Sequence, residues 1–174
     1  SMGQQVLFRA FVILLTYLVP DAAWAQGPVI DSISKVLRST TIDTQRVRCM
    51  VRLSVYMRYE DVDRGVALAD SAIMLSRNTD DLDGLHNAYT AKANALQILI
   101  AQGKGPWSDD SVIVLHEKAL RIAASIEDTL GMSIAHFNLG SVYSSRNPFI
   151  ALEHELEGFR LQREPNDLAQ HSCY

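Results

Sequence analysis

The sequence predicts an all-α fold made of stacked helical hairpins. From Asp43 onward the apolar residues recur three and four positions apart, as on one face of a helix, and no run alternates as strands do. Similar segments also recur along this part of the chain. The expected breaks between helices are the turn-forming stretches 59–62, 78–83, 103–110, 127–131, 146–148 and 164–167.

The first 25 residues have the layout of a secretory signal peptide. Arg9 precedes an apolar run from Ala10 to Val19, and Ala23-Trp24-Ala25 follows as a small-residue cleavage site. The run is shorter than the ~20 residues of a membrane span. We predict cleavage after Ala25 and export, most plausibly to a bacterial periplasm. The alternative is an uncleaved anchor or a packed N-terminal helix.

Residues 26–42 form a leading segment in which a short helix is expected. Ile30, Ile33, Val36 and Leu37 have helical spacing there.

Three segments of the remaining chain align with one another. They are "SAIMLSRNTDDLDG" from Ser71, "KALRIAASIEDTLG" from Lys118 and "EGFRLQREPNDLAQ" from Glu157. The second residue of each is small, and an aspartate follows it nine positions later: Ala72 and Asp81, Ala119 and Asp128, Gly158 and Asp167. The small residues lie 47 and 39 positions apart, and the difference equals the eight-residue turn-rich stretch 103–110. We therefore expect hairpins at about 43–79, 80–127 and 128–166.

The last residues resemble the beginning of another hairpin. "DLAQHSCY" matches the earlier "DLDGLHNAY", with Asp167-Leu168 aligned to Asp81-Leu82. We expect 167–174 to be the start of a truncated fourth repeat, and the chain to be a fragment of a longer protein. Self-association through this open C-terminal repeat is a further expectation.

The repeated unit resembles the tetratricopeptide repeat family in a variant longer than the usual 34 residues. The residues that carry the resemblance are Leu139, Gly140, Tyr143, Ala151, Gly158 and Pro165, with Ala93, Leu96 and Ala119 in the preceding unit. The first unit departs from the pattern, because Arg52 and Leu53 stand at its Leu-Gly position, so its packing must differ. Gly140 is expected at the close contact between paired helices.

The resemblance implies a right-handed α-solenoid. The first helix of each hairpin would line a concave groove that binds a protein or peptide segment. The candidate groove residues are Met57, Arg58, Thr90, Asn94, Gln97, Phe137, Asn138, Ser141 and Ser144. They are polar but almost uncharged, so no lysine and arginine clamp for a terminal carboxylate is expected. The alternative is that they are ordinary solvated residues of the helix faces.

Trp107, in the inserted loop, is the second candidate contact residue. An aromatic side chain on an eight-residue insertion can bind a partner, or it can fold back over the helices as a lid, which we favour.

The sequence contains no recognisable catalytic or metal-binding motif. His116-Glu117 and His154-Glu155 are adjacent pairs, whose side chains point in different directions on a helix. There is no His-Glu-x-x-His and no Gly-x-Ser-x-Gly, and Cys49 fits a small core position. The net charge of −4 argues against nucleic-acid binding. We predict a non-enzymatic chain without metal or cofactor.

A signal peptide followed by long repeats resembles the N-terminal sensory region of bacterial membrane-bound signalling proteins that carry tetratricopeptide repeats. In that case the protein would contact the membrane only through its signal peptide or through a membrane span downstream of residue 174. Two alternatives stay open: a free periplasmic scaffold for envelope complexes, and the non-catalytic part of an enzyme whose active site lies beyond residue 174.

Overall fold

The computed structural model describes residues 22–163, with side chains from residue 27 onward. The described part is all-helical and contains α2 (Ala22–Ser39), α3 (Asp43–Met57), α4 (Val62–Asn78), α5 (Leu82–Ala101), α6 (Asp109–Ser125), α7 (Thr129–Tyr143) and α8 (Pro148–Arg163). The predicted signal peptide, apart from Ala22–Ala25, and the expected fourth repeat at 167–174 lie outside the described residues. α2 begins four residues before the predicted cleavage point and continues through most of the leading segment.

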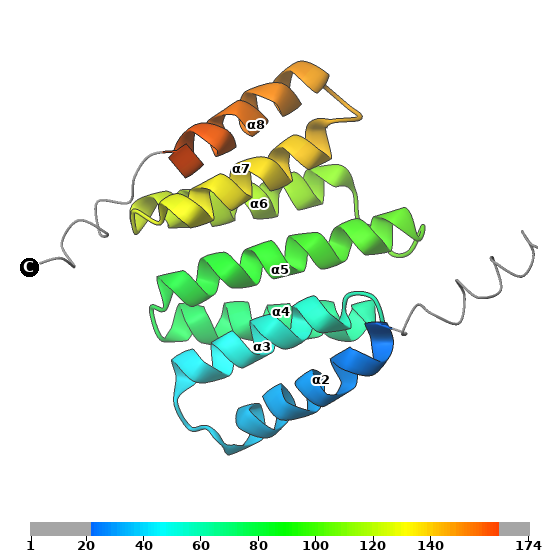
Figure 1. Ribbon diagram of the computed structural model, residues 1–174, viewed down its shortest axis with the longest axis vertical. Coiled ribbons are helices and arrows are strands. Elements are labelled where there is room, and N and C mark those ends of the chain that lie inside the picture. The colour runs from blue at the N-terminus through cyan, green and yellow to red at the C-terminus, as the bar shows by residue number, and fades with distance from the viewer. Residues whose placement is uncertain (1–21, 164–174) are drawn as a thin grey trace, which may run out of the picture.

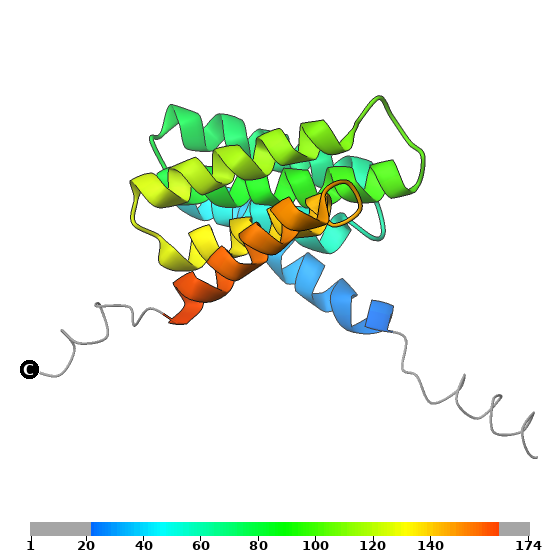
Figure 2. The same cartoon turned by 90° about the horizontal axis from the view of Figure 1, so that it is seen from above.

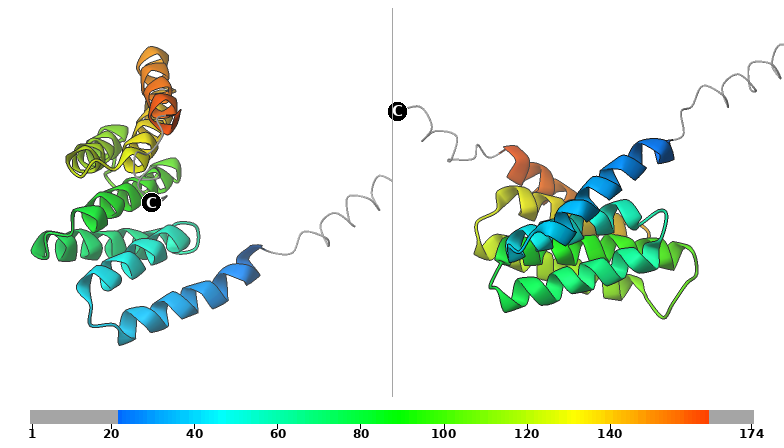
Figure 3. Two further views of the ribbon diagram at one scale, coloured as in Figure 1. Left: turned by 60° about the vertical axis from the view of Figure 1, so that its left-hand side comes forward. Right: turned by 90° about the horizontal axis from the view of Figure 1, so that it is seen from below.

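The helices pack in chain order (Figure 1). α3 pairs with α4, α5 with α6, and α7 with α8, while α4 contacts α5 and α6 contacts α7. α4 and α6 lie on one side of the stack, and α3 and α7 lie on the other (Figure 2). α2 and α8 occupy its opposite ends (Figure 3). Within residues 22–163, no helix combines the length and the apolar composition of a membrane span.

The hydrophobic core is continuous from one hairpin to the next. One cluster joins Val62 of α4 to Leu96 of α5, Val112 of α6 and Leu139 of α7. A second cluster joins α3, α4, α5 and α6, and a third joins α2 to α3. Each hairpin therefore buries its apolar residues partly against its neighbours.

The turn between hairpins is built twice in the same way. Asp80 and Glu127 have left-handed backbone conformations, with φ of 51° and 56°. The next residue ends one helix, because the N–H of Asp81 donates to the carbonyl of Ser76 and that of Asp128 to the carbonyl of Ala123. The same two aspartates cap the following helix. The side chain of each accepts a hydrogen bond of 2.9 Å from the backbone N–H of the residue three positions later, Gly84 or Gly131.

The glycine of this turn leaves room for the preceding first helix. A Cβ at Gly84 would lie 2.6 Å from Cγ1 of Val47 in α3, and a Cβ at Gly131 would lie 2.8 Å from Cε1 of His86 in α5. The Asp-x-x-Gly pattern of the sequence is thus a helix cap combined with a contact between consecutive first helices.

Gly140 lies at a close approach between α7 and α8. A Cβ there would be 3.1 Å from the carbonyl oxygen of Ala151 and 3.0 Å from Cγ of Glu155. In the first hairpin the close approach is made by a glycine of the second helix. A Cβ at Gly65 of α4 would lie 3.2 Å from the carbonyl oxygen of Ser54, which explains how Leu53 is accommodated at the position aligned with Gly140.

Candidate functional site

The predicted groove residues lie on the three first helices, α3, α5 and α7. α3 contacts α5, and α5 contacts α7, so the three sets follow one another across the stack. Those on α5 are partly buried, and those on and after α7 range from partly buried to exposed: Thr90, Asn94 and Gln97, then Phe137, Asn138, Ser141 and Ser144.

Met57 does not present a surface in this structure. Its side chain is buried, with 6% of its surface exposed, because it ends α3 against the start of α4. We therefore no longer count it among the residues that a partner could reach.

Two of the three hydroxyl groups of the groove face, those of Thr90 and Ser144, donate to backbone carbonyls within a few residues of themselves. Thr90 Oγ1 donates to the carbonyl of His86 at 3.1 Å, and Ser144 Oγ donates to the carbonyl of Ser141 at 2.8 Å. They are consequently weaker candidates for ligand recognition than the amides on the same face.

Two predicted groove residues carry buried donors without a hydrogen-bond partner among the described residues. They are Nδ2 of Asn138 and Nε of Arg58, whose guanidinium lies 4.7 Å from the ring centre of Tyr59. A buried N–H that lacks an acceptor costs about 1–3 kcal/mol. Such groups normally find an acceptor in water or in a bound molecule. Both atoms are buried, so a partner on the surface would reach them only after neighbouring side chains had moved.

Trp107 lies beside Lys92 of α5, and 39% of its surface remains exposed. Nζ of Lys92 lies 5.9 Å from the centre of the indole ring and 2.6 Å from Oδ1 of Asp70. Beneath the loop is a cavity of about 440 Å³, lined by Lys92, Leu96, Trp107, Asp110, Ser111, Val114 and Leu115. A second cavity of about 310 Å³ lies between α2 and α3 and is lined in part by Cys49, a buried free thiol.

Asp83, His86 and Asp128 are a group that sequence reasoning missed. Their potential ligand atoms all lie within 4.8 Å of one another, and Nε2 of His86 is 3.4 Å from Oδ2 of Asp128. Burial lowers the pKa of His86, while the two nearby carboxylates raise it. Among the described residues this is the arrangement that could hold a metal ion. Asp83 and His86 have the three-residue spacing that signals a shared helix face, but Asp128 comes from the next repeat.

The other histidines lie at contacts between helices. Nδ1 of His136 in α7 is 3.0 Å from Nδ1 of His154 in α8, and the ring of Tyr143 stacks on His154. Burial lowers the pKa of both histidines. His116 is fully buried in α6 with no hydrogen bond to either ring nitrogen, and burial lowers its pKa to about 4. It is therefore a neutral core residue at pH 7.

Comparison with known proteins identifies no relative: no family model, no curated protein and no solved structure matches the chain significantly.

Proposed function

We propose that the hairpins form a right-handed α-solenoid of the tetratricopeptide type, and that the face of α3, α5 and α7 binds an extended segment of another protein. The observation that carries the proposal is the set of partly buried amide side chains on the neighbouring helices α5 and α7, at Asn94, Gln97 and Asn138. A side-chain amide can both donate to and accept from a peptide main chain, which offers both kinds of group at regular intervals.

The repeated turn supports the solenoid part of the proposal. The same left-handed residue, capping aspartate and close-packed glycine occur at 80–84 and 127–131. Turns of the same conformation give consecutive hairpins the same relative orientation, and a solenoid requires such a repeated orientation.

Binding to this face can be tested with charged substitutions. Asn94→Arg and Ser141→Arg would put a bulky cation on α5 and α7, and Ser71→Arg on the exposed part of α4 is the matched control. Proteins captured from a bacterial envelope extract would be compared by quantitative mass spectrometry. We expect a specific set of partners to fall at least tenfold with the first two variants and to persist with the control. An identical set with all four proteins would reject the groove.

We further propose that the chain is exported and forms the extracytoplasmic sensory part of a membrane-bound signalling protein. The order of a secretory signal and a repeat region supports this. The gene sequence beyond codon 174 tests it. An apolar stretch of ~20 residues followed by an output domain is expected. A stop codon within one or two repeats would instead favour the free periplasmic scaffold.

Export itself has a direct test. The full chain expressed in a Gram-negative host should be recovered from the periplasmic fraction with Gln26 as its first residue, as read by intact mass. A cytoplasmic protein that keeps residues 1–25 would contradict the signal peptide. Hydrolase or transferase activity of residues 26–174 would contradict the non-enzymatic assignment.

A further inference from the structure

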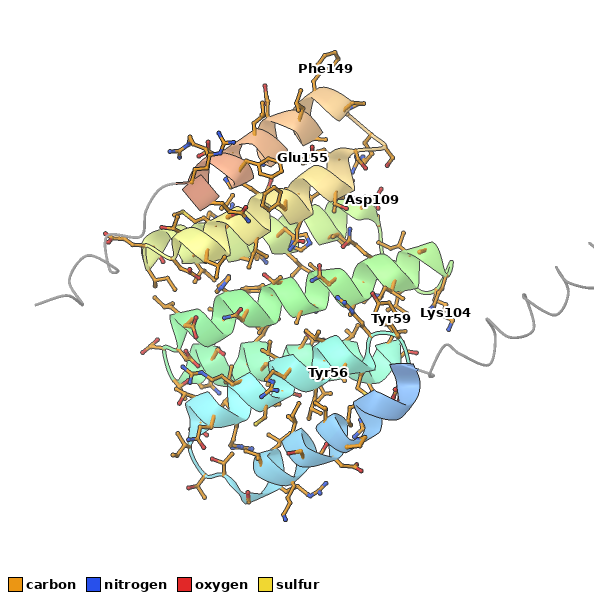
Figure 4. All side chains as sticks on the ribbon, viewed as in Figure 1. Tyr56, Tyr59, Lys104, Asp109, Phe149 and Glu155 are labelled. Atoms are coloured by element: carbon orange, nitrogen blue, oxygen red, sulfur yellow. The ribbon has the colours of Figure 1, made fainter. Side chains whose placement is uncertain are left out.

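α8 carries an exposed apolar stripe at the end of the stack. Phe149, Leu152, Leu156 and Phe159 are 82%, 52%, 60% and 56% exposed. Their spacing of three, four and three residues places them on one face of the helix, over a length of about 15 Å. Figure 4 shows Phe149 at the start of α8, pointing away from the rest of the stack. We call these four residues the α8 stripe.

At two positions of the α8 stripe, the second helix of every hairpin (α4, α6 and α8) has an apolar residue. The alignment of Ala72, Ala119 and Gly158 sets Leu152 against Ile113 of α6, and Phe159 against Ile73 of α4. Ile73 and Ile113 are each 7% exposed, in helices that the next first helix covers. A following repeat would account for Leu152 and Phe159 in the same way.

The other two positions differ between the helices. Phe149 aligns with Asp63 and Asp110, and Leu156 aligns with Asp70 and Glu117. In α4 and α6, which the first helix of the next hairpin covers, these two positions are occupied by acidic residues. The replacement of acids by Phe149 and Leu156 in α8 calls for a different contact, one that uses the whole stripe.

The order of residues in the α8 stripe is the same in both directions: Phe, Leu, Leu, Phe, with spacings of three, four and three. An identical helix running the opposite way therefore matches it at every position. Phe149 would lie opposite Phe159 of the second copy, and Leu152 opposite its Leu156. Antiparallel pairing also aligns the two helix dipoles favourably. Such a surface is self-complementary about a twofold axis.

We propose that the α8 stripe is a dimer interface, on which the α8 helix of a second copy of this chain packs antiparallel. This interface adjoins the proposed groove, because the ring of Phe159 packs edge-on against that of Phe137 with the ring centres 4.9 Å apart. The proposal does not require that the groove binds a partner. An interface confined to one helix of each copy is small, so a reversible dimer is expected.

The test is the mass of the full chain in solution as a function of concentration, measured by sedimentation or light scattering. We expect a shift from the 19.4 kDa monomer toward twice that mass. Leu156→Glu should abolish the shift. Met74→Glu, at an equally exposed apolar residue of α4, should leave it unchanged. A monomer at all concentrations, as when another segment of the chain covers the stripe, would overturn the proposal. So would association that Leu156→Glu does not reduce.

Cysteine crosslinking tests the orientation. In a background with Cys49→Ala and Cys173→Ser, a mixture of Leu152→Cys and Leu156→Cys proteins should form a disulfide dimer on mild oxidation. Each protein alone should crosslink at least fivefold less. Preferential crosslinking of Leu152→Cys with itself would indicate parallel helices and refute the antiparallel arrangement.

Discussion

The first and last hairpins bring their two helices equally close but place the necessary glycine on opposite helices. In α7–α8 the first helix supplies Gly140, and its Cβ position faces the carbonyl of Ala151. In α3–α4 the second helix supplies Gly65, which faces the carbonyl of Ser54. Both hairpins therefore have a close approach at which a side chain would not fit, and either helix can supply the glycine.

The largest expected effect follows from adding a side chain at Gly65. The three nearest atoms to its Cβ position are backbone atoms of Ser54, Met57 and Arg58, at the end of α3, so they cannot rotate away. Gly65→Leu should reduce the free energy of unfolding by about 3 kcal/mol, at the upper end of overpacking effects. Urea denaturation measures this. Gly27→Ala is the control, because nothing lies within 4 Å of its Cβ position. Equal stability of the Gly65→Leu protein and the wild type would show that the helices can separate without cost.

The middle hairpin differs from the first in having a histidine in its core, because α6 has His116 at the position where α4 has Ala69. Burial lowers the folded-state pKa of His116 from 6.5 to about 4, so the unfolded state binds the proton first. Above pH 6.5 the effect is absent, and stability falls as the pH decreases from 6.5 to 4. The loss from this residue should reach about 3 kcal/mol.

Denaturation at several pH values checks this prediction. The other histidines of lowered pKa act in the same direction, so the relevant quantity is the difference between wild type and His116→Ala. That variant should be less stable at pH 7.5, because it leaves a cavity, but should lose less stability on acidification. Parallel pH profiles for the two proteins would contradict a buried neutral His116.

Gly140→Leu should also destabilise the protein. The carbonyl oxygen of Ala151 lies 3.1 Å from its Cβ position, so the backbone of α8 obstructs a side chain here as the backbone near the end of α3 does at Gly65. We expect a loss of about 1–3 kcal/mol in the free energy of unfolding, measured by urea denaturation. Unchanged stability would show that α7 and α8 can separate without cost.

The smallest effects concern the repeated turn. Asp81→Ala and Asp128→Ala each remove one helix cap, and each should cost about 1 kcal/mol. The two losses should agree at pH 8, since the backbone of the turns is the same. At pH 5.5 the loss for Asp128→Ala should exceed that for Asp81→Ala. The Asp128 carboxylate raises the pKa of His86, so its removal makes protonation of that buried ring in the folded state more costly. The measurement is again denaturant unfolding at both pH values.

The sequence predicted the positions of the helices and the repeated turn, because both depend on neighbouring residues. Apolar spacing marked the helices, and Asp-x-x-Gly marked a cap that its own four residues complete. Gly65 was not predicted, because its role depends on the backbone of Ser54 in the preceding helix, which no spacing along the sequence indicates.

The candidate site was harder to anticipate from the sequence. Whether Met57 faces a groove or the core depends on the angle between α3 and α4, which no local pattern encodes. The contact between His86 and Asp128 joins residues of different repeats, so their separation along the chain hides it.

The turn between hairpins also determines where a whole hairpin can be deleted or inserted. All its hydrogen bonds and its left-handed residue lie within a few positions, at 76–84 and again at 123–131. A deletion of Gly84–Leu130 would therefore join Asp81-Leu82-Asp83 to Gly131 and restore an intact turn. A genetic recombination between the two turns would remove or duplicate one whole hairpin while keeping the hydrogen bonds of the turn.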